Sequence, residues 1–283
     1  MSNIGFIGLG IMGKPMAANL IKGGHTLFLQ SRSGVAKELT AAGGKACASA
    51  KEVAQKADII ITMVPDTPDV EKVLFGANGV AEGLSKGKTV VDMSSISPIE
   101  TKAFAKKIND LGCDYVDAPV SGGQAGAVNG ALTIMCGGAA PAFEAMRPVA
   151  LAFGRAVTRV GDSGAGQLAK MVNQIAIAGV VQGLSEAIAF GQCAGLDMPL
   201  VLDVIGKGAA QSWQMDNRGK TMVADKFDFG FAVDWMRKDL GLVFDEAKRN
   251  GAVLPVTMLV DQFYGDVQKL GGNRWDTSSL IKR

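Results

Sequence analysis

The sequence predicts an α/β protein in which a doubly wound domain over residues 1–162 precedes an all-helical domain over residues 163–283. Three observations lead to this fold class. A G-x-G-x-x-G motif, Gly8–Gly13, lies between a strand pattern and a helix pattern. Strand and helix patterns then alternate, which is typical of a parallel sheet covered by helices. After residue 164 only helix patterns follow.

The composition fits a packed soluble protein and excludes several functions. Of the 283 residues, 48% are hydrophobic and 37 are glycines, and 29 basic against 27 acidic residues leave a net charge of +2. No block of Lys or Arg could follow a phosphate backbone, so nucleic acid is not an expected partner. The sequence shows no export leader and no uninterrupted apolar run of the roughly 20 residues of a membrane span, so we expect no membrane association.

The four cysteines are scattered and form no C-x-x-C pair. This pattern favours a reducing cytoplasm and argues against a zinc site or a redox dithiol. No cluster of His, Asp and Glu has metal-ligand spacing, so we expect no metal. His25, the only histidine, precedes the second strand on the adenosine side of the expected fold, and we assign it no catalytic role.

The glycine motif follows a strand at Asn3–Gly8 and opens a helix at about Lys14–Lys22. In that context the first glycine permits a tight turn, the second lets the backbone approach a pyrophosphate, and the third lets the helix pack on the strand. The amides of the helix N-terminus would hold the anion. We therefore expect a dinucleotide on the six motif residues, Gly8, Leu9, Gly10, Ile11, Met12 and Gly13.

The end of the second strand, Thr26–Gln30, indicates which dinucleotide binds. An NAD-selective site would place a carboxylate there for the ribose 2'-hydroxyl, but this chain has Ser31, followed by Arg32 and Ser33. A guanidinium can make charge-assisted bonds to a 2'-phosphate, with the two hydroxyls as neutral donors. NADP is thus favoured over NAD. The alternative is that Arg32 is a solvated loop residue.

The remaining strands of the first domain extend the same sheet. They are expected at Lys45–Ala48, Ile59–Val64, Thr89–Met93, Asp114–Asp117 and Ala156–Val160, with crossover helices near Ser49–Lys56, Thr67–Leu74 and Pro98–Leu111. Ligands bind at the C-terminal ends of strands in such sheets, so Met63, Val64, Pro65, Ser94 and Ser95 are expected at the cofactor. Proline and serine are also common in ordinary turns, which leaves that alternative open.

A Ser-Gly-Gly turn, Ser121, Gly122 and Gly123, follows the strand Asp114–Asp117. It presents a hydroxyl and unshielded backbone amides, which suit a carboxylate or a developing oxyanion. As a bare motif it could be a plain loop. Its interpretation as a substrate site depends on Lys170 lying opposite.

A long helix from Gly164 to about Ala194 places Lys170 and Asn173 three residues apart, and therefore on one face. Their neighbours are mostly apolar, so we expect a largely buried helix. A buried lysine needs a partner or a purpose, because desolvation is costly and lowers its pKa. With histidine and metal excluded, Lys170 is the leading acid/base candidate; a solvated surface pair is the alternative.

The other helices of the second domain are expected at Pro199–Gly206, Met215–Val223, Ala232–Asn250 and Leu254–Leu270, with Gly251 as a C-cap. One of them carries a second lysine, Lys238, between apolar positions. An ordinary solvated helix lysine is the alternative interpretation.

Four blocks together resemble the signatures of the β-hydroxyacid dehydrogenase family, which includes 3-hydroxyisobutyrate dehydrogenase, tartronate semialdehyde reductase and the glyoxylate/succinic semialdehyde reductases. They are Gly5–Leu20, Asp117–Gly123, Gly164–Asn173 and Lys238–Leu240.

The resemblance runs over essentially the whole chain and implies a role for each block. Gly8, Gly10, Met12 and Gly13 would bind the cofactor phosphates and ribose, and Val64, Pro65 and Ser95 would line the adenosine and nicotinamide pocket. Ser121, Gly122 and Gly123 would hold the substrate carboxylate. Lys170 would be the catalytic acid/base, Asn173 would orient the substrate, and Lys238 would close the site near the nicotinamide or the substrate.

The expected reaction is reversible hydride transfer between NADP(H) and a short 3-hydroxy acid or its semialdehyde, such as tartronate or succinic semialdehyde, 3-hydroxyisobutyrate or glyoxylate. Family members that use NAD usually carry Asp where this chain has Ser31, which agrees with NADP. Two alternatives stay open: an imine or ketone reductase on the same scaffold, and a non-catalytic NADP-binding module. The long apolar helix also makes a homodimer or homotetramer plausible.

Overall fold

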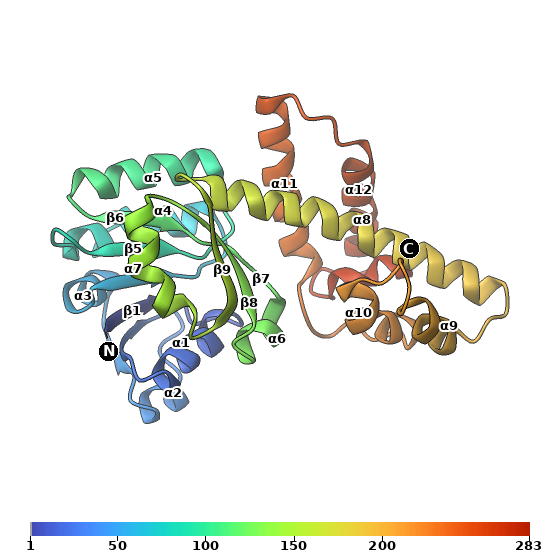
Figure 1. The fold of residues 1–283 in the computed structure, drawn as a ribbon, viewed down its shortest axis with the longest axis horizontal. Helices are drawn as coiled ribbons and strands as arrows, with labels where there is room; N and C mark the ends of the chain where they lie inside the picture. The colour runs from blue at the N-terminus through green and yellow to red at the C-terminus, as the bar shows by residue number, and fades with distance from the viewer. Residues whose placement is uncertain (1) are drawn as a thin grey trace. The chain divides into compact units, whose positions relative to one another are not determined.

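The chain divides into two units, with the boundary along the sequence between Lys170 and Met171, and a nine-stranded sheet forms the centre of the first unit. The computed structural model describes residues 2–283 (Figure 1). The strands are β1 (Asn3–Ile7), β2 (Thr26–Gln30), β3 (Lys45–Ala46), β4 (Ile59–Thr62), β5 (Thr89–Asp92), β6 (Asp114–Asp117), β7 (Val120–Ser121), β8 (Leu132–Gly137) and β9 (Gly154–Gly161). Their order is β3-β2-β1-β4-β5-β6-β8-β7, with β9 beside β8.

The strands from β3 to β6 are all parallel, with Ile4 of β1 opposite Leu27 of β2 and Ile59 of β4. From β1 the chain adds β2 and β3 on one side and then β4, β5 and β6 on the other. This is the topology of a doubly wound sheet, so the prediction is confirmed. The far edge differs from a purely parallel sheet, because β8 runs antiparallel to β6 and β7.

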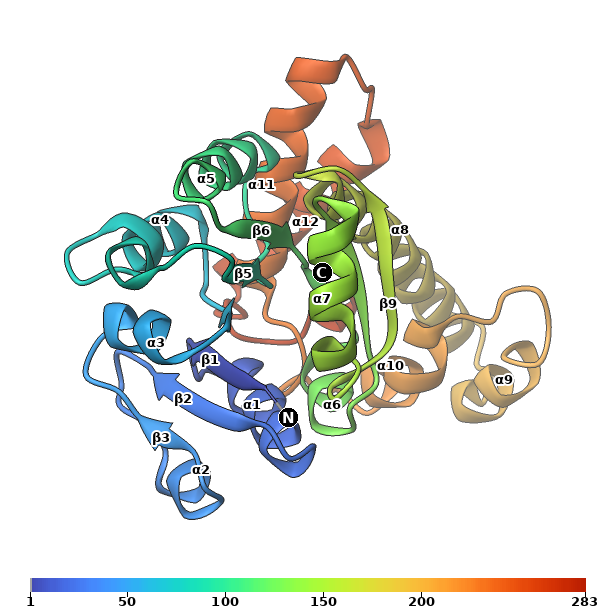
Figure 2. The same ribbon diagram turned by 60° about the vertical axis from the view of Figure 1, so that its left-hand side comes forward.

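Helices cover both faces of this sheet (Figure 2). They are α1 (Gly13–Lys22), α2 (Lys37–Ala41), α3 (Ala50–Lys56), α4 (Thr67–Phe75), α5 (Pro98–Asp110), α6 (Gly123–Val128) and α7 (Ala140–Ala150), with a 3-10 turn η1 at Val80–Gly83. Successive residues of β1 point to opposite faces, so Phe6 packs in the core under α1 and α7 and Ile7 in the core under α3, α4 and α5.

Local side chains fix where several of these helices begin. The Ser49 hydroxyl accepts the Glu52 amide at 3.1 Å and so caps α3, and the Glu52 carboxylate accepts the amide of Ala48, the residue before the cap, at 2.7 Å. Asp66 and Ser97 cap α4 and α5, each with a proline in the first turn. The short helices α2 and α6 and the helix α7 were not predicted. In α7 the interior Pro148 breaks the sequence pattern of a helix.

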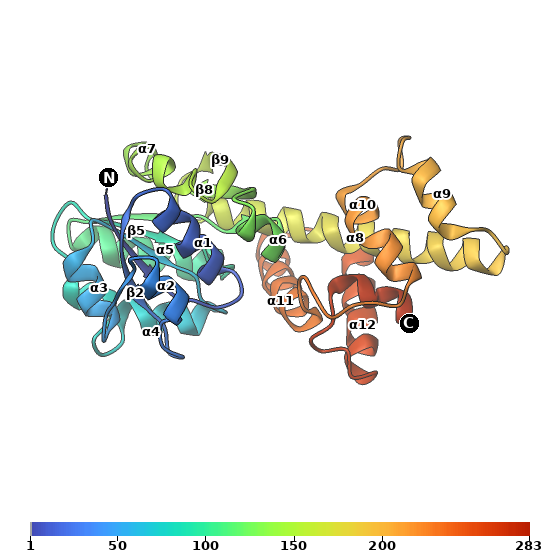
Figure 3. The same ribbon diagram turned by 90° about the horizontal axis from the view of Figure 1, so that it is seen from below.

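The second unit is helical, as predicted. Its elements are α8 (Ala165–Cys193), whose first turns belong to the first unit, α9 (Met198–Ile205), α10 (Trp213–Val223), α11 (Val233–Asn250), α12 (Pro255–Lys269) and a 3-10 segment η2 (Thr277–Lys282) (Figure 3). One core joins α8, α11 and α12, and a second joins α8, α9 and α10. Gly251 ends α11 with φ of 80°, so the predicted C-cap is confirmed.

Helix α8 is less buried in this single chain than its sequence predicts. Val172 is 67% exposed and Phe190 is 74% exposed, while Ala178 and Ile188 on other faces are buried. By length and composition alone the helix could cross a membrane, a test that the core helix of a soluble protein also passes. Buried Gln167, Lys170, Gln174 and Ser185 give it a polar interior side that a core helix can use.

Candidate functional site

The glycine motif forms a turn in which side chains would collide at two positions. Gly8 has φ of 96°, and a Cβ there would overlap the Met63 carbonyl oxygen; a Cβ on Gly13 would overlap the Gly8 carbonyl oxygen. A Cβ on Gly10, by contrast, would meet no protein atom within 4 Å. The backbone at Gly10 is thus open to an approaching group beside the N-terminus of α1, whose first turn has no acidic residue. This geometry fits a pyrophosphate.

The loop after β2 carries the three residues that we predicted to select NADP. The hydroxyls of Ser31 and Ser33 lie 3.3 Å apart, and the Arg32 guanidinium lies 3.3 Å from the Asp69 carboxylate. The Arg32 side chain is 77% exposed, so this ion pair is solvated and weak. Its guanidinium is therefore available to an anionic ligand.

The loops after β4 and β5 lie beside the glycine turn, because β4 neighbours β1 and β5 neighbours β4. The Val64 amide donates to the Ser94 hydroxyl at 3.0 Å, which ties the Met63–Pro65 loop to the Ser94–Ser95 loop. The parallel sheet thus brings Gly8, Val64 and Ser95 to one edge, as predicted for the C-terminal ends of neighbouring strands.

A buried carboxyl group lies under these loops. Asp92, at the end of β5, accepts the Thr62 hydroxyl at 2.7 Å, the Ser94 amide at 3.1 Å and the Tyr115 hydroxyl at 3.3 Å. Burial raises the pKa of Asp92, and these donors partly oppose the rise. Sequence reasoning missed this group, because a single Asp at the end of an apolar strand gives no signal of its partners.

A second buried carboxyl group holds the start of α8. Asp117, at the end of β6, accepts the Gly164 amide at 2.8 Å and the Gln167 amide at 3.0 Å. Burial raises its pKa to about 6, against the lowering by these backbone bonds. One turn further along α8, Lys170 is only 9% exposed. The first turn of the helix, and with it Lys170, is therefore fixed to the edge of the sheet.

The Ser-Gly-Gly segment is not a simple turn. Val120 and Ser121 form β7, which pairs with β8, and Gly123 begins the short helix α6. Gly122 and Gly123 have φ of 127° and 60°, conformations that favour glycine. The two glycines are thus required by the backbone path, whatever the segment binds.

In the second unit, a chain of buried polar groups connects Asn173 to Lys238. The Asn173 amide donates to Gln174 Oε1 at 2.8 Å, and Gln174 Nε2 donates to Asp239 Oδ2 at 2.6 Å. Lys238 Nζ lies 2.8 Å from Asp239 Oδ1. Two residues predicted from separate helices therefore belong to one network. Gln174 and Asp239, which link them, were not predicted, although Asp239 lies within a block that resembled the family.

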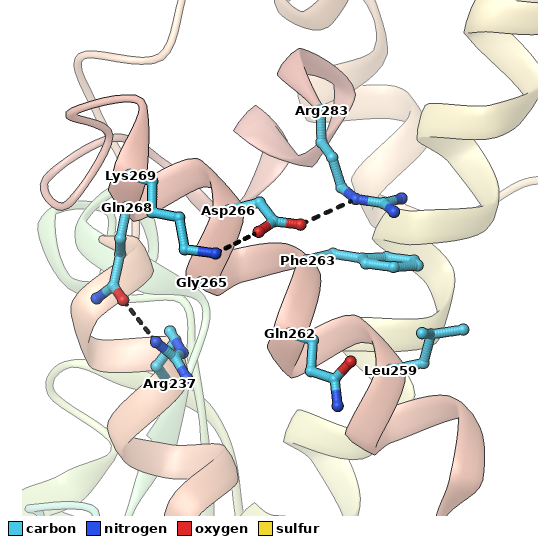
Figure 4. Close-up of a pocket in the computed structure, with 9 residues that line it drawn as sticks. All are labelled: Arg237, Leu259, Gln262, Phe263, Gly265, Asp266, Gln268, Lys269 and Arg283. Atoms are coloured by element: carbon cyan, nitrogen blue, oxygen red, sulfur yellow. Dashed lines mark hydrogen bonds and ion pairs between the residues drawn. The ribbon is translucent and has the colours of Figure 1, made fainter.

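A pocket of about 820 Å³ within the second unit is lined by Arg237, Leu259, Gln262, Phe263, Gly265, Asp266, Gln268, Lys269 and Arg283 (Figure 4). Its cations are already compensated. Asp266 accepts from Lys269 at 2.9 Å and from Arg283 at 3.4 Å, and Arg237 donates to Gln268 at 2.6 Å and to Asp261. The residues that line it include none of the predicted site residues, so we do not assign the activity to this pocket.

No group of three or more His, Cys, Asp or Glu residues within residues 2–283 is arranged to hold a metal ion. A glycine cradle on a doubly wound sheet, with a buried lysine on a helix anchored to the same edge, defines an NAD(P)-binding oxidoreductase.

Comparison with known proteins agrees with this class. Residues 3–161 match the family model described as the NAD binding domain of 6-phosphogluconate dehydrogenase, and residues 164–283 match that of the NAD-binding domain of NADP-dependent 3-hydroxyisobutyrate dehydrogenase. The 2-hydroxy-3-oxopropionate reductase of Escherichia coli K12 is 44% identical over 99% of this chain and 96% of its own length.

Two solved structures share the whole fold. The 3-hydroxyisobutyrate dehydrogenase of Mycobacterium tuberculosis with L-serine has a TM-score of 0.88 at 30% identity, covering 100% of this chain and 98% of that one. The structure of Psf3 in complex with NADP+ and 2-OPP has a TM-score of 0.88 at 25% identity, covering 99% of each chain. The chain therefore belongs to the β-hydroxyacid dehydrogenase family, the family of 3-hydroxyisobutyrate dehydrogenase, and the resemblance noted in its four sequence blocks is confirmed.

Proposed function

We propose that this protein catalyses reversible hydride transfer between NADP(H) and a short 3-hydroxy acid or its semialdehyde, with Lys170 as the acid/base. The observation that carries this proposal is the position of Lys170. It is 9% exposed and lies one turn beyond Gln167, which is bonded to the loop after β5 and to Asp117 at the end of β6. This position at the C-terminal edge of the sheet, where the glycine motif also lies, supports the assignment of Lys170 as the proton donor.

The bound nicotinamide supplies or accepts the hydride. During reduction Lys170 donates a proton to the carbonyl oxygen as it becomes an alkoxide, and in oxidation it takes the hydroxyl proton. General acid help of this kind is typically worth about 10²- to 10⁴-fold in rate. Ser121 and the amides of Gly122 and Gly123 bind the substrate carboxylate, Asn173 orients the substrate, and Lys238 closes the site.

The preference for NADP over NAD rests on the loop after β2. It offers the Arg32 guanidinium and the hydroxyls of Ser31 and Ser33, and no carboxylate follows Gln30 directly. A 2'-phosphate would compete with Asp69 for Arg32, and because the Arg32 side chain is 77% exposed, its ion pair with Asp69 is weak. The complex of Psf3 with NADP+ supports this choice.

Assembly and compartment belong to the same proposal. Large apolar side chains are exposed on four helices of the second unit, including Val172 and Phe190 of α8, Leu200 of α9, Trp213 of α10 and Val256 of α12. Exposed apolar surface of this kind favours a homodimer or homotetramer. The four cysteines are free, which fits a reducing cytoplasm.

The proposal is tested by following NADPH absorbance with purified protein and a panel of carbonyl compounds. Tartronate, succinic and methylmalonate semialdehydes and glyoxylate form one set, and cyclic imines form the other. We expect oxidation of NADPH with at least one semialdehyde, slower oxidation of NADH, and none with the imines. Turnover confined to the imines would replace the proposed substrate class, and NADPH binding without any turnover would indicate a non-catalytic module.

A further inference from the structure

The side chain of Gln167 makes two hydrogen bonds to the backbone, one on each side of Ser95 in the loop after β5. Its Nε2 donates to the Ser94 carbonyl oxygen at 2.8 Å, and its Oε1 accepts the Ile96 amide at 3.0 Å. The residue between these two peptide groups is Ser95, predicted to lie at the cofactor. Gln167 is 1% exposed, and both polar ends of its amide are used, so its burial is compensated.

The loop that Gln167 holds is also fixed from below. The Ser94 amide donates to Asp92 at 3.1 Å, and the Ser94 hydroxyl accepts the Val64 amide at 3.0 Å. These bonds join the loop to β5 of the sheet and to the loop that follows β4. Gln167 adds the connection to α8, the helix that carries Lys170.

The position of Gln167 on α8 makes this connection relevant to catalysis. Its backbone amide is bonded to Asp117, and Lys170 lies three residues later on the same helix face. Gln167 therefore holds two elements: its side chain is bonded on both sides of Ser95, and its backbone amide ties the start of α8 to Asp117.

We propose that Gln167 is a positioning residue that sets the Ser95 loop relative to Lys170, so that the nicotinamide and the proton donor are held at a fixed separation. The inference rests on the proposed function, since it assigns Ser95 to the cofactor and Lys170 to proton transfer. Misplacement of reacting groups by about 1 Å can cost on the order of 10²-fold in rate, so loss of the two hydrogen bonds of the Gln167 side chain should affect turnover more than binding.

The first test replaces the amide by an apolar side chain of similar length, Gln167→Met. We expect kcat to fall about 10²-fold in the folded protein with little change in the Kd for NADPH, and the Tm to fall, because the Ser94 carbonyl oxygen and the Ile96 amide lose a buried partner. Gln192→Met, an exposed site on the same helix, is the matched control and should behave as wild type. An unchanged kcat, or a loss of kcat that only follows a loss of folded protein, would overturn the inference.

The second test is a variant whose hydrogen bonding depends on pH, Gln167→Glu. Its carboxyl group can donate to the Ser94 carbonyl oxygen only when it is protonated; ionised, it places a second lone pair against that oxygen. Activity relative to wild type should therefore rise as the pH is lowered. The wild-type profile, measured over the same pH range, is the reference for groups that both proteins share, including Asp92 and Asp117. A flat ratio would show that Gln167 only fills space.

A third readout does not need turnover. In cofactor-free protein, exchange of the Ile96 amide hydrogen should be at least about 10-fold faster in Gln167→Met than in wild type, because its acceptor is gone. Equal exchange rates would show that the Gln167 side chain does not hold the Ile96 amide by a hydrogen bond. If the wild type turns over no carbonyl compound, the proposed function fails, and this exchange measurement still decides whether Gln167 fixes the loop.

Discussion

The Asp117 carboxylate and the backbone amide of Gln167 are joined by a 3.0 Å hydrogen bond across 50 residues of sequence. Together with the 2.8 Å bond from Gly164, it ties the end of β6 to the first turn of α8. The helix that carries Lys170 is therefore anchored by a buried acid.

This anchor should give folding stability a pH dependence. Because burial raises the pKa of Asp117 from 3.8 to about 6, the folded chain holds this proton more firmly than the unfolded chain. At 1.36 kcal/mol per pKa unit, this raised pKa adds about 3 kcal/mol to the free energy of unfolding. The full amount is present below about pH 4 and is lost as the pH rises to about 6. In Asp117→Asn that part of the decline should vanish.

Urea unfolding between pH 4 and 7 measures this effect. Asp92, whose pKa burial also raises, contributes a decline of the same sign, so the comparison is between slopes and not absolute stabilities. The exposed Asp110→Asn serves as the matched control. A slope in Asp117→Asn equal to that of wild type would mean that Asp117 does not titrate as the structure indicates.

Replacing Lys170 by Met should abolish most turnover, because the variant has no proton to give to the developing alkoxide. We expect kcat to fall about 10²- to 10⁴-fold and the Kd for NADPH to stay close to that of wild type. Steady-state kinetics and NADPH fluorescence titration measure the two quantities. Lys248→Met, at a 78% exposed site, controls for loss of a helix lysine. Substantial residual turnover in the Lys170 variant would remove the residue from catalysis.

The loop after β2 should decide cofactor preference. Arg32→Ala removes a charged donor, and hydrogen bonds to charged groups are worth about 1.5–3 kcal/mol, so NADPH should bind roughly 10- to 100-fold more weakly with little effect on NADH. Ser31→Asp should also favour NADH, because a carboxylate repels a 2'-phosphate and accepts from a 2'-hydroxyl. Parallel titrations with both cofactors test this, with exposed Arg147→Ala as control. Equal weakening of both cofactors would place Arg32 outside phosphate selection.

The glycines of the motif should respond differently to alanine. At Gly10 the added Cβ meets no protein atom within 4 Å, so Gly10→Ala should fold normally and bind NADPH at least about 10-fold more weakly. At Gly13 it overlaps the Gly8 carbonyl oxygen, so Gly13→Ala should lose stability by about 1–3 kcal/mol, as overpacking typically does. Thermal unfolding and NADPH titration of both variants separate the effects. NADPH binding by Gly10→Ala as tight as that of wild type would show that the cofactor does not approach the backbone at Gly10.

Much of the fold follows from local pattern. The alternation of apolar strands and amphipathic helices predicted the parallel strands from β1 to β6, and Gly251 was recognised as the end of α11. Helix α7 escaped prediction because Pro148 interrupts its pattern, and the antiparallel direction of β8 depends on pairings that no local signal carries.

The candidate site divides in the same way. Its individual residues could be named from the sequence, because a glycine motif, a serine and arginine loop and a lone lysine each have a recognisable chemistry. Their partners could not, since Asp92, Asp117, Gln167 and Gln174 acquire meaning only from atoms distant in sequence that the fold brings within hydrogen-bonding distance.

The sequence by itself thus determined the fold class, the glycine cradle and Lys170 as the candidate proton donor, because these depend on periodicity and on residue type over short spans. Only the tertiary structure decided how the helix carrying Lys170 is held. The Asp117 carboxyl group and the Gln167 amide group are buried, and polar groups removed from water need hydrogen-bond partners. Those partners lie on loops and elements distant in sequence, so they come within reach only when the chain is folded.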